Sequence, residues 1–157
     1  MVRTITFIID GDVANVALAA CALRGACSLS AICQERLDEL ELAVVEAINN
    51  IIEHGFEDRP CLPIRIVTEL QPDQITVRLA DSGKSIPAEL LDQARHTGFS
   101  AEIDDLNKLP EGGMGLRLIM QSVDQVAYTA SDDNNELLLV KMIAPVDDLG
   151  RSDQPVP

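Results

Sequence analysis

Basic residues are scarce in this chain, which has 12 Lys and Arg against 26 Asp and Glu and a formal net charge of −14 over 157 residues. Direct binding to nucleic acid requires clustered Lys and Arg that neutralise phosphates, so we expect no direct nucleic-acid partner. No apolar run approaches the roughly 20 residues of a membrane-spanning helix, and the start, MVRTITFIIDGD, lacks the long apolar region of a signal peptide. We therefore expect no membrane partner and a cytoplasmic location.

Aromatic residues are also rare. They make up 3% of the chain, with no Trp, whereas hydrophobic residues make up 46%, so the core must consist of Leu, Ile, Val and Ala. This apolar content excludes disorder of the whole chain, and the length is that of one domain. We expect that domain over residues 1–144, followed by a flexible acidic tail with several prolines over residues 145–157.

Short metal-binding spacings are missing too. The four cysteines include no C-x-x-C pair, which disfavours a zinc knuckle, and their wide spacing disfavours the disulfide framework of a small secreted protein. We therefore expect buried, reduced thiols. The cysteines are Cys21, Cys27, Cys33 and Cys61.

Hydrophobic periodicity predicts an α+β fold. Alternation with a period of two indicates strands, and apolar residues three and four apart indicate helices. The turn residues at 71–73 join two strands into a hairpin, so we expect a mixed, mostly antiparallel sheet with helices on one face, in a two-layer sandwich. The expected strands cover residues 2–9, 62–70, 74–80, 125–130 and 136–143, and the expected helices cover residues 13–26, 31–54 and 114–123.

One face of the long second helix carries two carboxylates and two amides. At 100° per residue from Glu46, Asn49 lies at about 300°, Glu53 at about 340° and Asn50 at about 40°, so the four share one sector. A solvated helix face would explain this sector, although adjacent Asn residues are indifferent helix formers and such faces favour Lys, Glu and Gln. Amide and carboxylate oxygens one turn apart also suit Mg²⁺, which binds a few protein oxygens and retains water or phosphate oxygens.

A second candidate site, Asp81-x-Gly83, stands where a strand of the first hairpin ends. Taken alone, it is explained by an Asx-type turn. An Asp at a strand end beside a glycine can also accept a hydrogen bond from the amino group of a heterocyclic ring. The pair by itself does not decide between the two interpretations.

A third candidate site, Gly113-Met114-Gly115-Leu116, runs directly into an apolar helix. A flexible first turn would explain the glycines. The functional interpretation is that unhindered N–H groups at the positive end of the helix dipole bind an anion, most plausibly phosphate. The spacing matches neither the Walker A motif nor the dinucleotide motif G-x-G-x-x-G, so those two nucleotide folds are excluded.

The order of these three motifs resembles the N, G1 and G2 boxes of the ATP-binding superfamily that contains gyrase B, Hsp90, histidine kinases and MutL. Within that superfamily, the stretch EAINNIIEHG at 46–55 and the G-M-G-L stretch at 113–116 are similar to anti-sigma-factor serine kinases of the RsbW and SpoIIAB type. The similarity covers about residues 2–143. It implies a Bergerat-type two-layer sandwich that uses ATP and Mg²⁺.

The resemblance implies a chemical role for the helix and the strand end. Asn50 would supply its side-chain oxygen to Mg²⁺, which bridges the ATP phosphates. Glu46, one turn earlier, would be the catalytic general base toward the hydroxyl of a protein serine. Asp81 would accept the adenine amino hydrogen, and Gly83 would leave room for the base.

The resemblance also implies phosphate contacts and a lid. Backbone N–H groups at Gly113 and Gly115 would reach the phosphates, and residues 88–112 would form a lid that becomes ordered when nucleotide binds. The further cofactor-binding positions implied by the motifs are Asn49, Met114 and Leu116.

Three positions depart from the family pattern. Ser85 replaces the second glycine of the G1 box, where a side chain restricts the backbone. The turn into the last strand, often Gly-Thr in relatives, reads Asn-Glu-Leu at 135–137, which removes a hydroxyl expected near the adenine. The later lid is acidic and has no arginine just before the G2 glycines, so Lys84 and Arg117 are the nearest basic candidates. Each departure predicts weaker ATP binding.

The leading hypothesis is an ATP-dependent protein-serine kinase and anti-sigma factor. By resemblance, it would hold a sigma factor inactive and phosphorylate a serine of a STAS-domain anti-anti-sigma antagonist; a homodimer is an expectation from the family only. The alternative is a module of the same fold that sequesters a partner without phosphorylating it, which Ser85 and Glu136 favour. The catalytic half of a split histidine kinase and an unrelated α+β domain are the remaining interpretations.

Overall fold

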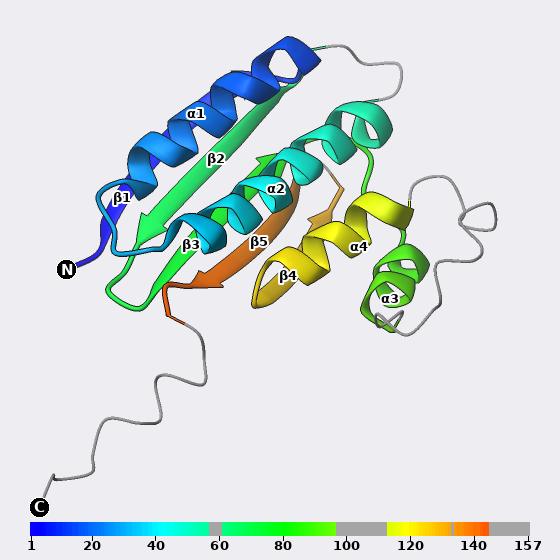
Figure 1. Cartoon of the computed structure of the whole chain (residues 1–157). Helices are drawn as coiled ribbons and strands as arrows, with labels where there is room; N and C mark the ends of the chain where they lie inside the picture. The colour runs from blue at the N-terminus through cyan, green and yellow to red at the C-terminus, as the bar shows by residue number, and fades with distance from the viewer. Residues whose placement is uncertain (57–60, 97–112, 133, 145–157) are drawn as a thin grey trace, which may run out of the picture.

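A five-stranded sheet lies beneath a layer of helices in the computed structural model, which describes residues 1–56, 61–96, 113–132 and 134–144 (Figure 1). The expected tail and residues 97–112 of the expected lid lie outside this description. The strands are β1 (Arg3–Asp10), β2 (Pro63–Leu70), β3 (Gln74–Asp81), β4 (Gln125–Ser131) and β5 (Asn134–Met142). The helices are η1 (Val13–Asn15), α1 (Val16–Cys27), α2 (Gln34–Asn50), η2 (Ile51–Gly55), α3 (Ala88–His96) and α4 (Gly113–Ser122).

The sheet has the order β1-β2-β3-β5-β4, and all four pairings are antiparallel. The Gln71 N–H donates to Gln74 O at 2.9 Å in the turn that closes the β2–β3 hairpin, as its turn residues predict. Strand β5 inserts between β3 and its own hairpin partner β4, so residues such as Val77 and Leu139 pair across the centre of the sheet. The predicted fold class, an α+β sandwich with a mostly antiparallel sheet, is confirmed.

Helices α1, α2 and α4 cover one face of the sheet (Figure 1). Alternation along the strands directs aliphatic side chains such as Ile66, Val77 and Leu139 toward this layer, where they are fully buried. Leu40 and Val44 of α2 belong to the same core cluster. Aliphatic residues therefore form most of the core, as the composition predicts. None of the helices in the described ranges is long and apolar enough to cross a membrane.

The long second helix differs from its prediction over 31–54. The α-helix begins at Gln34 and ends at Asn50, and the residues that follow form a π-helical turn, η2 (Ile51–Gly55). In this wider turn the Phe56 N–H donates to Ile51 O at 3.0 Å. Single π-helical turns are rare and are frequent at functional sites.

The cysteines differ in part from their prediction. All four thiols are free, as expected, but only Cys27 is buried. The expectation of burial is wrong for the three others, because they lie on outward-facing or loop positions, and these are Cys21, Cys33 and Cys61. Burial raises the pKa of the Cys27 thiol to about 11.

Charged side chains connect the N-terminal half of α2 to strand β5 and to Asp124, which precedes β4. Lys141 of β5 is only 4% exposed, and its Nζ donates to Ser122 O at 2.8 Å and pairs with the Glu39 carboxylate at 2.5 Å. Arg36 donates to both carboxylate oxygens of Asp124 at 3.2 Å. Burying an ammonium group is costly unless it is paired, and here each charge has a partner.

Candidate functional site

The C-terminal half of α2 and the start of α4 meet at Glu46, Asn50 and Gly115. A Cβ atom placed on Gly115 would lie 3.0 Å from Asn50 Oδ1 and 3.1 Å from Glu46 Oε2. These distances are shorter than most contacts of a Cβ atom, so a side chain at position 115 would require Asn50 or Glu46 to shift by a few tenths of an ångström. The structure therefore brings the carboxylate, the amide and the glycine-containing helix start into one place.

Asn50 has a polar atom without a protein partner. Its Nδ2 is buried and makes no hydrogen bond to any part of the chain that the structure describes. An unsatisfied buried polar atom costs about 1–3 kcal/mol. The two ends of the amide are interchangeable in assignment, so the observation is that one end of this buried side chain has no described hydrogen-bond partner.

The π-helical turn connects α2 to the segment that follows β3. The Lys84 N–H donates to Gly55 O at 2.8 Å, and a Cβ on Gly83 would lie 2.7 Å from the same carbonyl oxygen. Gly83 is thus required for the close approach of two backbone segments. This constraint differs from the predicted role of Gly83, which was to leave room for a base.

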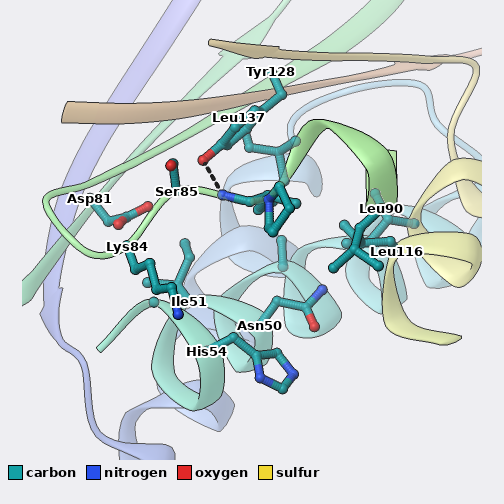
Figure 2. A pocket seen from close by; sticks show the side chains of 15 residues that line it. Asn50, Ile51, His54, Asp81, Lys84, Ser85, Leu90, Leu116, Tyr128 and Leu137 are labelled. Atoms are coloured by element: carbon teal, nitrogen blue, oxygen red, sulfur yellow. Dashed lines mark hydrogen bonds between the residues drawn. The ribbon is translucent and has the colours of Figure 1, made fainter. Parts of the chain in front are cut away.

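Asp81 is buried at the end of β3, and its carboxylate lines a cavity (Figure 2). Its Oδ1 accepts hydrogen bonds from the Gly83 N–H at 2.7 Å, as in an Asx turn, and from Asn135 Nδ2 at 3.0 Å. Asn135 Nδ2 also donates to Gly83 O at 2.9 Å. The Asx-turn interpretation and the binding interpretation are therefore compatible, because the turn uses Oδ1 and leaves Oδ2.

Tyr128 of β4 holds the other end of the same segment. Its hydroxyl oxygen accepts a hydrogen bond from the Ile86 N–H at 2.9 Å (Figure 2). Burial is the main cause that raises the pKa of Tyr128, and the charge of Asp81 raises it further, against the opposing effect of the Ile86 N–H. The phenol is therefore neutral at physiological pH. Sequence reasoning missed Tyr128, and inward alternation along the expected strand at 125–130 was the signal that could have found it.

The cavity between α2, the segment after β3, α4 and strands β4 and β5 has a volume of about 210 Å³. This is below the roughly 300–1,000 Å³ of pockets that enclose a whole small ligand. It suits one ring system, with the rest of a larger ligand extending past Asn50, which lies at the cavity wall (Figure 2). Most of its lining is apolar and includes Ile51, Ile86, Leu90, Leu116, Ile119 and Leu137.

The other predicted site residues fall into two groups. Leu116 lines the cavity, as does His54, which the sequence analysis did not predict as a site residue. Asn49, Gly113 and Met114 are not among the residues that line it; the Met114 side chain is exposed, and a Cβ on Gly113 would have no neighbour within 4 Å. The expected nucleotide contacts of these three residues therefore depend on the motif alone.

Two departures from the family pattern do not obstruct the cavity. Cys61 is the only non-glycine residue with a positive φ in the described ranges, so Ser85 lines the cavity without the left-handed backbone that a glycine would permit. Glu136 pairs with Ala80 across the sheet, and alternation places it on the face opposite Leu137, which lines the cavity. The third departure, the acidic lid, lies outside the described residues.

The donor set beside the cavity fits a hard divalent cation. Glu46 and Asn50 supply carboxylate and amide oxygens, which Mg²⁺ prefers, and one end of the Asn50 amide has no described partner. No cluster of three or more His, Cys, Asp or Glu residues suited to a metal occurs within the described residues. A cation here would therefore take its remaining ligands from bound phosphate or water.

Comparison with known proteins identifies the family of the chain. The family model described as histidine kinase-like ATPase domain matches residues 9–141. Serine-protein kinase RsbW of Oceanobacillus iheyensis is 33% identical over 111 residues, which cover 71% of this chain and 69% of that protein. An anti-sigma F factor of Clostridium beijerinckii is 27% identical over 107 residues, which cover 68% of this chain and 71% of that protein.

Two solved structures share the fold. The RsbU and RsbW domains of a Mycobacterium tuberculosis protein match 91% of this chain with a TM-score of 0.63 at 13% identity, and this chain spans 33% of that one. A histidine kinase domain from Erythrobacter litoralis matches 90% with a TM-score of 0.56 at 17% identity, and this chain spans 65% of it. With its motifs in matching order, the chain belongs to the histidine kinase-like ATPase family and, within it, to the RsbW and SpoIIAB type.

Proposed function

We propose that this protein is an ATP-dependent protein-serine kinase that also acts as an anti-sigma factor. The observation that carries the proposal is the convergence of Glu46 and Asn50 with the α4 start, where a Cβ on Gly115 would lie within 3.1 Å of both side chains. A general base, a metal ligand and a helix N-terminus for phosphate are the parts that phosphoryl transfer needs. The adjoining apolar cavity offers a place for the base of the nucleotide.

In the proposed reaction, each group of this site has one task. Asp81 accepts a hydrogen bond from the adenine amino group, and the N–H groups at the start of α4 orient the phosphates. Glu46 takes the proton from the serine hydroxyl of the protein substrate while that oxygen bonds to the γ-phosphorus and the bond to the ADP oxygen breaks. Mg²⁺, when held by Asn50 and phosphate oxygens, supplies charge that stabilises the transferring phosphoryl group.

The proposed partners are a sigma factor and a STAS-domain anti-anti-sigma protein. The names of the relatives, serine-protein kinase RsbW and anti-sigma F factor, support this assignment. The net charge of −14 favours a partner surface with basic residues, and in that case added salt should slow association more than dissociation. A homodimer and a cytoplasmic location complete the proposal.

The test is transfer of label from γ-labelled ATP to purified STAS-domain proteins in the presence of Mg²⁺. The expected result is label on a serine of one such protein with the wild-type chain and none with Glu46→Gln. Label that persists with Glu46→Gln would indicate a contaminating kinase. Absence of transfer to any STAS-domain protein, with sigma-factor binding retained, would replace the kinase with the second candidate.

That second candidate is a module that sequesters its partner without phosphoryl transfer. The departures from the family pattern at Ser85 and Glu136 favour it, because each predicts weaker ATP binding. ATP binding without label transfer would support this candidate, and label transfer that depends on Glu46 would exclude it.

A further inference from the structure

The segment 81–87, which we name the base-recognition segment, lacks the second glycine of its family motif but is fixed by side chains from two other strands. At its start, Asp81 and Gly83 are bonded to Asn135 of β5. At its end, the Ile86 N–H is bonded to the Tyr128 hydroxyl of β4. Neither Asn135 nor Tyr128 belongs to a motif that the proposed function uses.

The surroundings of Asn135 determine which of its side-chain atoms makes hydrogen bonds. Its Nδ2 faces two acceptors, Asp81 Oδ1 at 3.0 Å and Gly83 O at 2.9 Å. A rotated amide would place an oxygen against both acceptors, so this orientation is set by the network. Asn135 is 2% exposed, and its Oδ1 has no hydrogen-bond partner among the described residues. An unsatisfied buried acceptor is unfavourable, so the favourable contribution of Asn135 comes from the two hydrogen bonds that it donates.

Those two hydrogen bonds determine how Asp81 faces the cavity. Oδ1 accepts from both Asn135 Nδ2 and the Gly83 N–H, so the rotation of the carboxylate is fixed. Oδ2 is then the oxygen left to accept a hydrogen bond from a ligand in the cavity that Asp81 lines. A ligand amino group meets a preoriented acceptor, which lowers the entropic cost of binding.

Tyr128 fixes a different part of the segment. Its hydroxyl accepts a hydrogen bond from the Ile86 backbone N–H, and Ile86 and Pro87 both line the apolar part of the cavity. A ring in the cavity would contact this wall whether or not the ring carries an amino group. Loss of the hydroxyl should therefore weaken binding of all purine rings to a similar extent.

We propose that Asn135 and Tyr128 are positioning residues for the nucleotide base: Asn135 orients Asp81 toward a ring amino group, and Tyr128 holds the cavity wall against the ring. The inference rests on the proposed function, because it takes the ligand to be ATP. It explains the conformation of the segment by the hydrogen bonds from strands β4 and β5. Ser85 is then compatible with nucleotide binding.

The experiment compares the affinities of ATP and of purine riboside triphosphate, which lacks the 6-amino group. The wild-type chain should prefer ATP. In Asn135→Ala the affinity for ATP should fall about tenfold, and that for purine riboside triphosphate by less than about twofold. Asn134→Ala, which removes the neighbouring exposed side chain, is the matched control and should change neither. In Tyr128→Phe both affinities should fall by a similar factor of about three to ten.

Several results would overturn the inference. Equal losses of both ligands in Asn135→Ala would indicate a general structural role. If that variant does not fold, Asn135→Ser, whose single hydroxyl hydrogen can serve at most one of the two acceptors, must still show a reduced preference for ATP. Wild-type affinity in Tyr128→Phe would remove Tyr128 from the inference. Equal wild-type affinities for the two triphosphates would contradict recognition of the amino group while leaving the kinase proposal intact. A wild-type chain that binds neither triphosphate would contradict both.

Discussion

The two ends of helix α2 have opposite polar environments. At the N-terminal end, Lys141 and Glu39 form an ion pair, and Arg36 and Asp124 form another, so the charges there are matched. Toward the C-terminal end, Asn50 has a buried amide atom with no described partner, and a π-helical turn follows it. The same helix thus has one end at which charged groups are paired and one end at which a buried polar atom has no described partner.

We expect this difference to separate residues that determine stability from residues that contribute to the proposed function. Satisfied buried groups lose stability when a partner is removed. Unsatisfied groups at a binding site cost stability in the free protein and contribute only when a ligand is present. Substitutions at the two ends of α2 should therefore produce different phenotypes.

Glu46→Gln should give the largest effect and should affect activity alone. Without a carboxylate to accept the serine proton, the rate of phosphoryl transfer should fall by about 10²–10⁴-fold. The free energy of unfolding should change by no more than about 0.5 kcal/mol, because the side chain is replaced by one of the same shape. Label transfer and urea unfolding measure the two quantities. A large loss of stability would instead indicate that Glu46 stabilises the fold, as the ion-paired residues at the N-terminal end of α2 do.

Glu39→Ala should destabilise the fold without affecting ATP binding. Among the described residues it leaves Lys141, which is 4% exposed, with only the Ser122 carbonyl as a partner. The cost should be about 2 kcal/mol, less than for a fully buried pair, because the Glu39 side chain is 44% exposed. Lys141→Met is the matched comparison, because it removes the buried charge itself, and it should cost less. Urea unfolding of both variants tests this order. If Lys141→Met is the more destabilised of the two, the claim that an unpaired charge on Lys141 destabilises Glu39→Ala is contradicted.

Cys27 allows a test of how stability depends on pH near the N-terminal end of α2, because α1 ends at this residue and α2 begins at Gln34. The pKa of its thiol is about 11 in the fold against an ordinary value of 9.0. Between these values the unfolded chain loses the proton and the folded chain keeps it, so stability should fall as the pH rises from 9 to 11, by about 2 kcal/mol in all. Urea unfolding at pH 8.5 and at about pH 11 should show this loss. Cys27→Ala should lack that component, and an identical pH dependence would contradict the assignment.

Gly115→Ala and Gly113→Ala should give the smallest effect, a difference in ATP affinity between two variants at the start of α4. Both changes favour the helix by up to about 1 kcal/mol. Only the Cβ at position 115 would meet Asn50 and Glu46, so ATP affinity should fall about tenfold more in Gly115→Ala than in Gly113→Ala. Calorimetric titration with ATP measures both. Equal affinities would show that the close contact at Gly115 has no role in binding.

Much of the fold was predictable because its signals are local. Alternation indicated the strands, and the turn at 71–73 indicated the first hairpin. The position of β5 between β3 and β4 depends on pairs such as Val77 with Leu139, which no local pattern specifies. The π-helical turn was missed because Ile51 and Ile52 suit either type of helix; the bond from the Lys84 N–H to Gly55 O is a distant contact.

The site was predictable where motif order and residue chemistry coincide. The proximity of Glu46 and Asn50 to the start of α4 could be predicted because they stand one turn apart ahead of the two glycine motifs. Tyr128 and Asn135 act on residues 42 and 54 positions away, and Asn135 was noted only as part of a turn. Such partners depend on strand register, which becomes evident only in the folded chain.

The most direct test of the central claim is the affinity for ATP with and without Mg²⁺, measured by calorimetric titration in the wild-type chain and in Asn50→Ala. The account predicts that Mg²⁺ strengthens ATP binding in the wild type and has little effect in the variant, because the metal ligand is gone. No ATP binding at millimolar concentration, or the same effect of Mg²⁺ in both chains, would contradict it.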